Sequence, residues 1–208
     1  MPTITRDGAT IGFGVDGPED GTALLLYHGT TMDRLAWDMV IAALPPDHGL
    51  RFVKPEFPGS GESSMPTAPL TVDQLVADGI AVVDELGIDR FHVAGYSLGA
   101  VIAAATAAAA GERVASATLL CGWVVSDPRM VFTFGLWQQL IATDPALFMR
   151  YAVADGFTPG AIGALWDSVE EVVALGATAI APGSAAQLDL DIALDITPLL
   201  GTITAPSE

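Results

Sequence analysis

The stretch FHVAGYSLGA, residues 91–100, is the feature that most constrains what this chain can fold into. It places Ser97 midway between Gly95 and Gly99, after an apolar run and before an alanine-rich run. The G-x-S-x-G spacing is typical of a sharp turn from a buried strand into a helix, with the serine hydroxyl presented at the turn. A side chain at either glycine would collide with the neighbouring strand or helix. The stretch therefore predicts a strand, a tight turn and a helix with a reactive serine between them.

The remaining patterns alternate between strands and helices. Strands are predicted in TITRDGATIGFGV (two strands joined at Asp7-Gly8), TALLLYHG, RFVKPEF and VASATLLCG, and helices at 35–44, 71–86 and 98–111. This alternation favours an α/β fold, a mostly parallel sheet flanked by helices on both faces. From Trp123 to about Ile180 the pattern is purely helical and rich in aromatic residues. No internal repeat or linker divides the chain, so residues 1–208 are interpreted as a single domain.

Composition excludes several classes of function. The formal net charge is -17, which disfavours a nucleic-acid or membrane-surface partner because both would repel the protein. The N-terminus lacks the apolar stretch of a secretory signal, so a cytoplasmic location is the default expectation. The single cysteine, Cys121, lies in the apolar run VASATLLCGW and is predicted to be a small buried core residue.

Three motifs in order, YHGTT, PEFPGSGES and GYSLG, give the chain a resemblance to the α/β hydrolase fold. It is most similar to small bacterial esterases, enol-lactonases and cofactor-free haloperoxidase-like serine hydrolases. The resemblance covers essentially the whole chain. It implies a helical cap at about 123–185, no cofactor, and a small, fairly apolar carboxylic ester or lactone as substrate.

The resemblance also assigns roles to residues. Ser97 would be the nucleophile, and the backbone N–H of Leu98, at the start of the helix, one donor to the oxyanion. The second donor would come from the loop after LLLYHG, where Thr30 matches best and Thr31 is the alternative. Tyr96 and Trp123, near the active-site ends of their strands, are candidates for the substrate pocket, together with Thr31.

No histidine in the sequence is a convincing base for Ser97. His28, in the H-G position, is by the resemblance a structural residue that bonds the loop behind the oxyanion donors. His92 lies five residues before Ser97 in the same extended strand, and His48 stands in a loop next to prolines. Asp127 is either an alternative catalytic acid or the residue that caps the helix beginning at Pro128. Glu56 is expected to fix the glycine loop.

The last residues suggest why the base is missing. In α/β hydrolases a segment resembling DITPLLGTITAP leads into the strand that carries the catalytic acid, and the histidine follows later. We therefore expect this chain to be an N-terminal portion, without its C-terminal strands and inactive alone. The strand at 114–122 would then be an open sheet edge available for self-association. The alternative is a non-catalytic pseudo-hydrolase that binds a small apolar ligand.

Other motifs do not support a cofactor or a metal. Gly12, Gly14 and Gly17 match a dinucleotide fingerprint, but a turn and no helix is predicted after them. Asp189, Asp191 and Asp195 lack the glycine and the terminal glutamate of a calcium loop. No two histidines have metal-ligand spacing.

Overall fold

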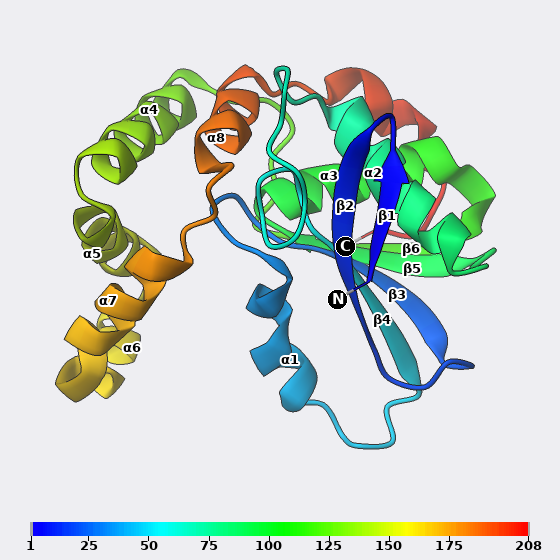
Figure 1. The fold of residues 1–208 in the computed structure, drawn as a ribbon, viewed down its shortest axis with the longest axis horizontal. Coiled ribbons are helices and arrows are strands. Elements are labelled where there is room, and N and C mark those ends of the chain that lie inside the picture. The colour runs from blue at the N-terminus through cyan, green and yellow to red at the C-terminus, as the bar shows by residue number, and fades with distance from the viewer. Residues whose placement is uncertain (1, 208) are drawn as a thin grey trace. The chain divides into compact units, whose positions relative to one another are not determined.

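The computed structural model describes residues 2–207 and contains a six-stranded mixed sheet (Figure 1). The strand order is β1-β2-β4-β3-β5-β6. Antiparallel pairing joins β1 (Thr3–Arg6) to β2 (Ala9–Asp16), and β2 to β4 (Leu50–Pro55). The strands β4, β3 (Thr22–Tyr27), β5 (Phe91–Tyr96) and β6 (Val114–Leu120) are parallel to one another. The predicted fold class is confirmed.

Helices cover both faces of the sheet. Alternate strand residues point to opposite sides, and the apolar residues on each side pack against helices. Leu25 and Val53 belong to the main core, which also includes residues of α2 (Val72–Glu85) and α3 (Leu98–Ala110). Their neighbours Leu26 and Phe52 belong to a smaller core with Trp37, which ends the 3₁₀ helix Arg34–Trp37 before α1 (Asp38–Ala42). Each buried strand therefore packs on two layers, which explains its continuous apolar sequence.

Local signals in the sequence determine most of the element boundaries. Asp7 and Gly8 both have positive φ, as a two-residue hairpin loop requires. The Thr71 hydroxyl caps α2 by accepting from the Gln74 N–H, and Gly87 follows its end at φ +67°. The helix predicted at 35–44 is instead a 3₁₀ turn followed by the five-residue α1.

Residues 127–180 form a second compact unit made of helices. It contains α4 (Pro128–Thr143), α5 (Pro145–Gly156), α6 (Pro159–Ala164), the 3₁₀ turn Trp166–Ser168 and α7 (Val169–Ala179). Within it the Trp137 ring packs edge-on against Phe134 and Phe148. That this unit acts as a cap stays a prediction.

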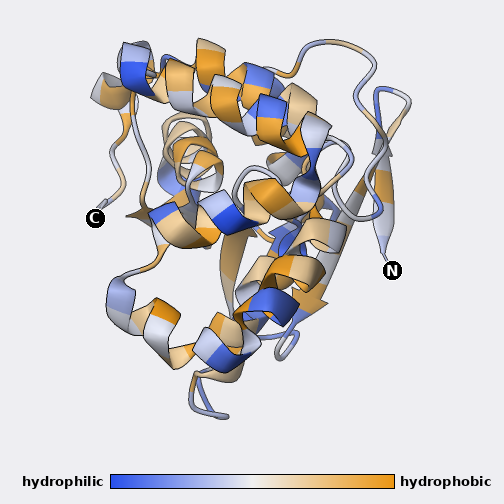
Figure 2. Cartoon of the chain, turned by 90° about the vertical axis from the view of Figure 1, so that its left-hand side faces the viewer, coloured by the Kyte–Doolittle hydropathy of each residue, from blue (hydrophilic) through white to orange (hydrophobic). Residues whose placement is uncertain are grey.

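The first unit comprises residues 1–126 and 181–208, so the helical segment is shorter than the sequence suggested. Trp123 precedes α4 and is not helical, because the backbone at 124–126 bonds to residues 194–196. The helix α8 (Ser184–Ala193) and the 3₁₀ turns Gly111–Arg113 and Thr197–Thr202 also belong to the first unit. Figure 2 shows hydrophobic and hydrophilic residues mixed along the helices, in keeping with partly exposed positions.

Two predictions from the sequence concern the region around β6. Cys121 is exposed, so its predicted burial is wrong: β6 ends at Leu120, and the chain turns at Cys121 with φ +55°. β6 is the last strand of the sheet, and its Ala117 N–H donates to the Pro206 carbonyl oxygen at 2.9 Å. Self-association through residues 114–122 remains a prediction. None of the helices described within 2–207 has the length and hydropathy needed to span a membrane.

Candidate active site

Ser97 lies at the turn between β5 and α3, in a backbone conformation that a serine rarely adopts. Its φ is +57° and its ψ is -122°. A Cβ on Gly95 would lie 2.0 Å from the Gly99 carbonyl oxygen, and one on Gly99 would lie 2.3 Å from the Tyr27 carbonyl oxygen. Both glycines are therefore required by close backbone approach. A strained non-glycine residue held in this way is a frequent feature of functional sites.

The start of α3 supplies a backbone donor next to Ser97. Leu98 is the first residue of the helix, so its N–H has no partner four residues earlier. The Ser97 N–H, by contrast, donates to the Leu120 carbonyl oxygen at 2.9 Å and is already occupied. The helix dipole adds a partial positive charge at this end. Negative charge developing near Ser97 is therefore favoured.

The loop after β3 distinguishes the two threonines that the sequence left open. The Thr31 N–H donates to Oε1 of Gln187 at 3.0 Å, so this donor is taken. No hydrogen bond described within residues 2–207 is donated by the Thr30 N–H, whereas its hydroxyl donates to Asp191. Gly29 lies against the serine, because a Cβ on it would be 3.3 Å from the Ser97 Cβ. Of these two threonines, Thr30 is therefore the one whose backbone N–H is left to donate.

His28 is fully buried, and both of its ring nitrogens are engaged. Its Nδ1 lies 2.8 Å from the Gly29 carbonyl oxygen, and the Phe57 N–H donates to its Nε2 at 3.1 Å. These partners require a neutral ring with the proton on Nδ1. Burial lowers the pKa of His28 to about 4, so the ring stays neutral. It joins two loops and has no nitrogen free to accept a proton from Ser97.

The other candidate bases and acids are placed elsewhere. Ser97 comes five positions after His92, a distance of roughly 16 Å along extended chain, and His92 Nδ1 pairs with Ser116 Oγ at 2.7 Å. His48 Nδ1 accepts the Leu50 N–H in its own loop. Asp127 caps α4 by accepting from the Met130 N–H at 2.8 Å, which supports the capping interpretation.

Glu56 fixes the glycine loop, as the sequence predicted. Its Oε2 accepts the Glu62 N–H at 2.7 Å, and its other oxygen pairs with Arg34. The Glu56 side chain has no exposure to solvent.

Of the predicted pocket residues, Tyr96 is 40% exposed, and its ring lies against Gly29. Trp123 lines an apolar cavity of about 170 Å³ between α3 and the segment 196–203. The Trp123 Nε1–H donates to Ser126 Oγ at 2.9 Å. Tyr96 therefore adjoins the serine turn directly, while Trp123 lines a neighbouring apolar space.

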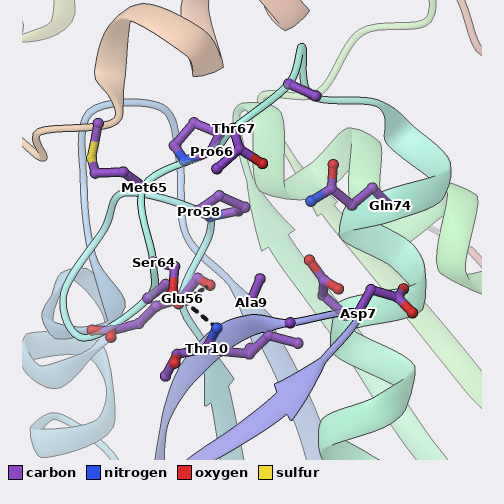
Figure 3. A pocket seen from close by; sticks show the side chains of 15 residues that line it. Asp7, Ala9, Thr10, Glu56, Pro58, Ser64, Met65, Pro66, Thr67 and Gln74 are labelled. Carbon is purple, nitrogen blue, oxygen red and sulfur yellow. Dashed lines mark hydrogen bonds between the residues drawn. The ribbon is translucent and has the colours of Figure 1, made fainter.

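A separate cavity of about 260 Å³ lies beside the glycine loop (Figure 3). The β1–β2 hairpin contributes Asp7 and Thr10, and α2 contributes Gln74 and Asp78. Its lining includes neither Ser97 nor the two proposed oxyanion donors. It therefore has no part in chemistry at the serine turn.

Two residues of α8 that the sequence analysis did not identify also contribute to the site. Gln187 and Asp191, four positions apart and so on one helical face, are both fully buried and bond the loop at Thr30 and Thr31. In the sequence, Asp191 stands out only as part of an incomplete calcium motif. The one available signal was two polar residues on the side of the helix that carries Leu188, Leu190 and Leu194. Among residues 2–207 no group of three or more His, Cys, Asp or Glu is arranged to hold a metal ion.

Comparisons with known proteins identify the family of the chain. A family model described as the alpha/beta hydrolase fold matches residues 22–163, well over half of the chain. The chain is 30% identical over 211 residues to a pyrrolizixenacetamide deacetylase of Xenorhabdus hominickii, covering all of this chain and 78% of that protein.

More distant similarities are of the same kind. A 3-oxoadipate enol-lactonase of Acinetobacter baylyi is 29% identical over 98 residues, which span 47% of this chain and 36% of that protein. The crystal structure of an enol-lactonase from Burkholderia xenovorans superimposes with a TM-score of 0.83 at 20% identity. That superposition covers 99% of this chain and 79% of the lactonase chain, and at this identity it shows the fold alone.

Proposed function

Since the chain belongs to the α/β hydrolase family, we propose that it is a serine hydrolase acting through an acyl-enzyme on Ser97. The substrate class proposed is a small, fairly apolar carboxylic ester or lactone. The observation that carries the proposal is the strained Ser97 turn beside two backbone donors, the N–H groups of Leu98 and Thr30, that lack partners within residues 2–207.

The chemistry follows from this arrangement. Ser97 Oγ attacks the carbonyl carbon, the C–O bond forms, and the carbonyl electron pair moves to the oxygen. The Leu98 and Thr30 N–H groups would hold that oxyanion while a base, which imidazole in solution can supply, takes the serine proton. The oxyanion then collapses, the bond from the carbonyl carbon to the alkoxide breaks, and the alkoxide leaves with that proton. Water then hydrolyses the acyl-enzyme and releases the acid. An apolar acyl group fits the exposed Tyr96 ring beside Ser97.

No histidine within residues 2–207 is placed to serve as the base, so we expect residues 1–208 alone to be slow. The oxyanion donors and binding would leave a residual acceleration of roughly 10³-fold over water. Imidazole in solution should supply part of the missing proton transfer. Hydrolysis of p-nitrophenyl butyrate should therefore increase with imidazole more steeply for the wild type than for Ser97→Ala.

The matched control is Ser168→Ala, which removes an exposed serine of the helical unit. It should behave as the wild type. After treatment of the wild type with a fluorophosphonate probe, which reacts covalently with nucleophilic serines, mass spectrometry should find the adduct on Ser97 only. Full turnover without imidazole that disappears in Ser97→Ala would show that the chain does hold a base. Rates that are identical in the wild type and Ser97→Ala under all conditions would contradict the hydrolase proposal.

A pseudo-hydrolase that binds a small apolar ligand is the second candidate. It is supported by the absence of a suitable base near Ser97 within residues 2–207 and by the apolar cavity beside Trp123. If this is correct, p-nitrophenyl butyrate should perturb Trp123 fluorescence saturably without being hydrolysed.

A further inference from the structure

The helix α8 contacts two consecutive residues of the loop that follows β3. The Thr30 hydroxyl donates to Oδ2 of Asp191 at 2.6 Å, and the Thr31 N–H donates to Oε1 of Gln187 at 3.0 Å. These contacts link positions 161 and 156 residues apart in the chain. All four residues belong to the first compact unit.

Gln187 is held on its other side as well. Its Nε2 donates to Ser60 Oγ at 3.0 Å, and the Ser60 hydroxyl donates to the Met32 carbonyl oxygen at 2.8 Å. The side chain is fully buried. With the amide fixed in this orientation, Oε1 faces the Thr31 N–H, and that N–H cannot turn towards another acceptor.

Asp191 has the opposite character, because only part of its carboxyl group is bonded. Oδ2 accepts from Thr30, whereas Oδ1 is buried without a hydrogen-bond partner among the described residues. Its backbone carbonyl oxygen accepts from the Ser126 hydroxyl at 2.5 Å, which anchors the helix beneath it. A buried carboxyl with one unpaired oxygen is costly for stability, so a purely structural origin explains it poorly.

We propose that Gln187 and Asp191 are positioning residues that determine which amide of the loop is left for the oxyanion. Gln187 occupies the Thr31 N–H, and Asp191 holds the Thr30 side chain away from its own N–H. Of these two loop amides, Thr30 is then the one that joins Leu98 in donating to the oxyanion. This inference rests on the proposed function. It adds the residues that leave Thr30, and not Thr31, to serve as the second donor.

The protonation of Asp191 is consistent with this role. Burial raises the pKa of Asp191 to about 7, and the only opposing influence is the Thr30 hydroxyl. A neutral carboxyl at mildly acidic pH keeps a net negative charge away from a site where an oxyanion must form. A permanently ionised acid at this position would oppose that charge.

Amide hydrogen exchange, followed by NMR on the full chain, tests the positioning without requiring turnover. The Thr31 N–H should be protected in the wild type and should exchange about tenfold faster or more in Gln187→Met, which removes the acceptor. Asp191→Asn keeps an acceptor for Thr30 and should leave the loop signals close to the wild type, whereas Asp191→Leu should shift them. Asp189→Asn, an exposed carboxyl on the same helix, is the matched charge control.

Binding of butylboronic acid, which forms a tetrahedral adduct on a serine hydroxyl, tests the consequence for the oxyanion. Misplacing the donor should weaken binding about 10- to 100-fold in Thr30→Val and Gln187→Met, while Thr30→Ser, which keeps the hydroxyl, should restore it. Melting temperatures measured in parallel separate this loss from unfolding. If the contacts served stability alone, boronate affinity would follow the melting temperature, and Thr30→Ser would not recover affinity relative to a Thr30→Val variant of equal melting temperature.

The outcomes separate this inference from the proposed function. If Thr31 exchange is unchanged in Gln187→Met, or if boronate affinity is the same in the wild type and in every variant, the positioning role is wrong. If the exchange changes as expected but the wild type binds no boronate at Ser97, the loop contacts stand and the oxyanion role fails together with the proposed function.

Discussion

The two buried side chains that contact the loop at 28–31 from opposite sides differ in how completely they are hydrogen-bonded. On the side of the glycine loop, His28 bonds through both nitrogens, to Gly29 and to Phe57. On the side of α8, Asp191 bonds through one oxygen only, to Thr30. Both side chains are fully buried. One is a complete hydrogen-bonded link, and the other retains an unpaired polar atom.

This difference shows how one loop can be held rigidly by His28 and still adjoin a titratable carboxyl, that of Asp191. Burial disfavours the charged form of each residue, which lowers the pKa of His28 to about 4 and raises that of Asp191 to about 7. Both are neutral between those values. Their contributions to stability then change with pH in opposite directions over the same range, and partly cancel in the wild type.

The largest expected effect concerns Asp191. Its pKa rises from an ordinary 3.8 to about 7, so the folded chain retains a proton that the unfolded chain has lost. This stabilisation is complete below about pH 4 and disappears as pH rises through 7, with a total of up to about 4 kcal/mol. Subtracting the urea unfolding free energy of Asp191→Asn from that of the wild type, between pH 4 and 8, isolates it. A flat difference would mean that the carboxyl is ionised throughout.

His28 should give a somewhat smaller effect of opposite slope. Its pKa falls from 6.5 to about 4, so the unfolded chain binds the extra proton. The stabilisation is complete above pH 6.5 and is lost as pH falls towards 4, with a total of about 3 kcal/mol. The same urea titration on His28→Asn measures it. A difference that instead grows on acidification would contradict the neutral, doubly bonded ring.

The smallest effect should come from Asp127, an exposed carboxyl that only caps a helix. Replacing it in Asp127→Ala removes the acceptor of the Met130 N–H and should lower the free energy of unfolding by about 1 kcal/mol. Thermal unfolding of the variant and the wild type under the same conditions measures this difference. Loss of fluorophosphonate labelling at Ser97 in this variant, without unfolding, would revive Asp127 as a catalytic acid.

The sequence predicted the parts of the site that depend on local backbone geometry. The turn at Ser97 follows from two glycines two positions away, and the Leu98 donor follows from the start of the next helix. The structural role of His28 was expected from its motif. Cys121 was placed incorrectly because an apolar run predicts burial but does not reveal the residue at which a strand ends and the chain turns outward.

What the sequence determined by itself is therefore the order of elements, the α/β sheet and the conformation of the serine turn, since periodicity, caps and glycine positions act over a few residues. The choice between Thr30 and Thr31, and the part played by Asp191, depend on contacts across more than 150 residues. Only the folded chain brings α8 against that loop. Hydrogen-bond partners so distant leave no periodic signal in the sequence, because their pairing is created by the packing of the helix on the sheet unit.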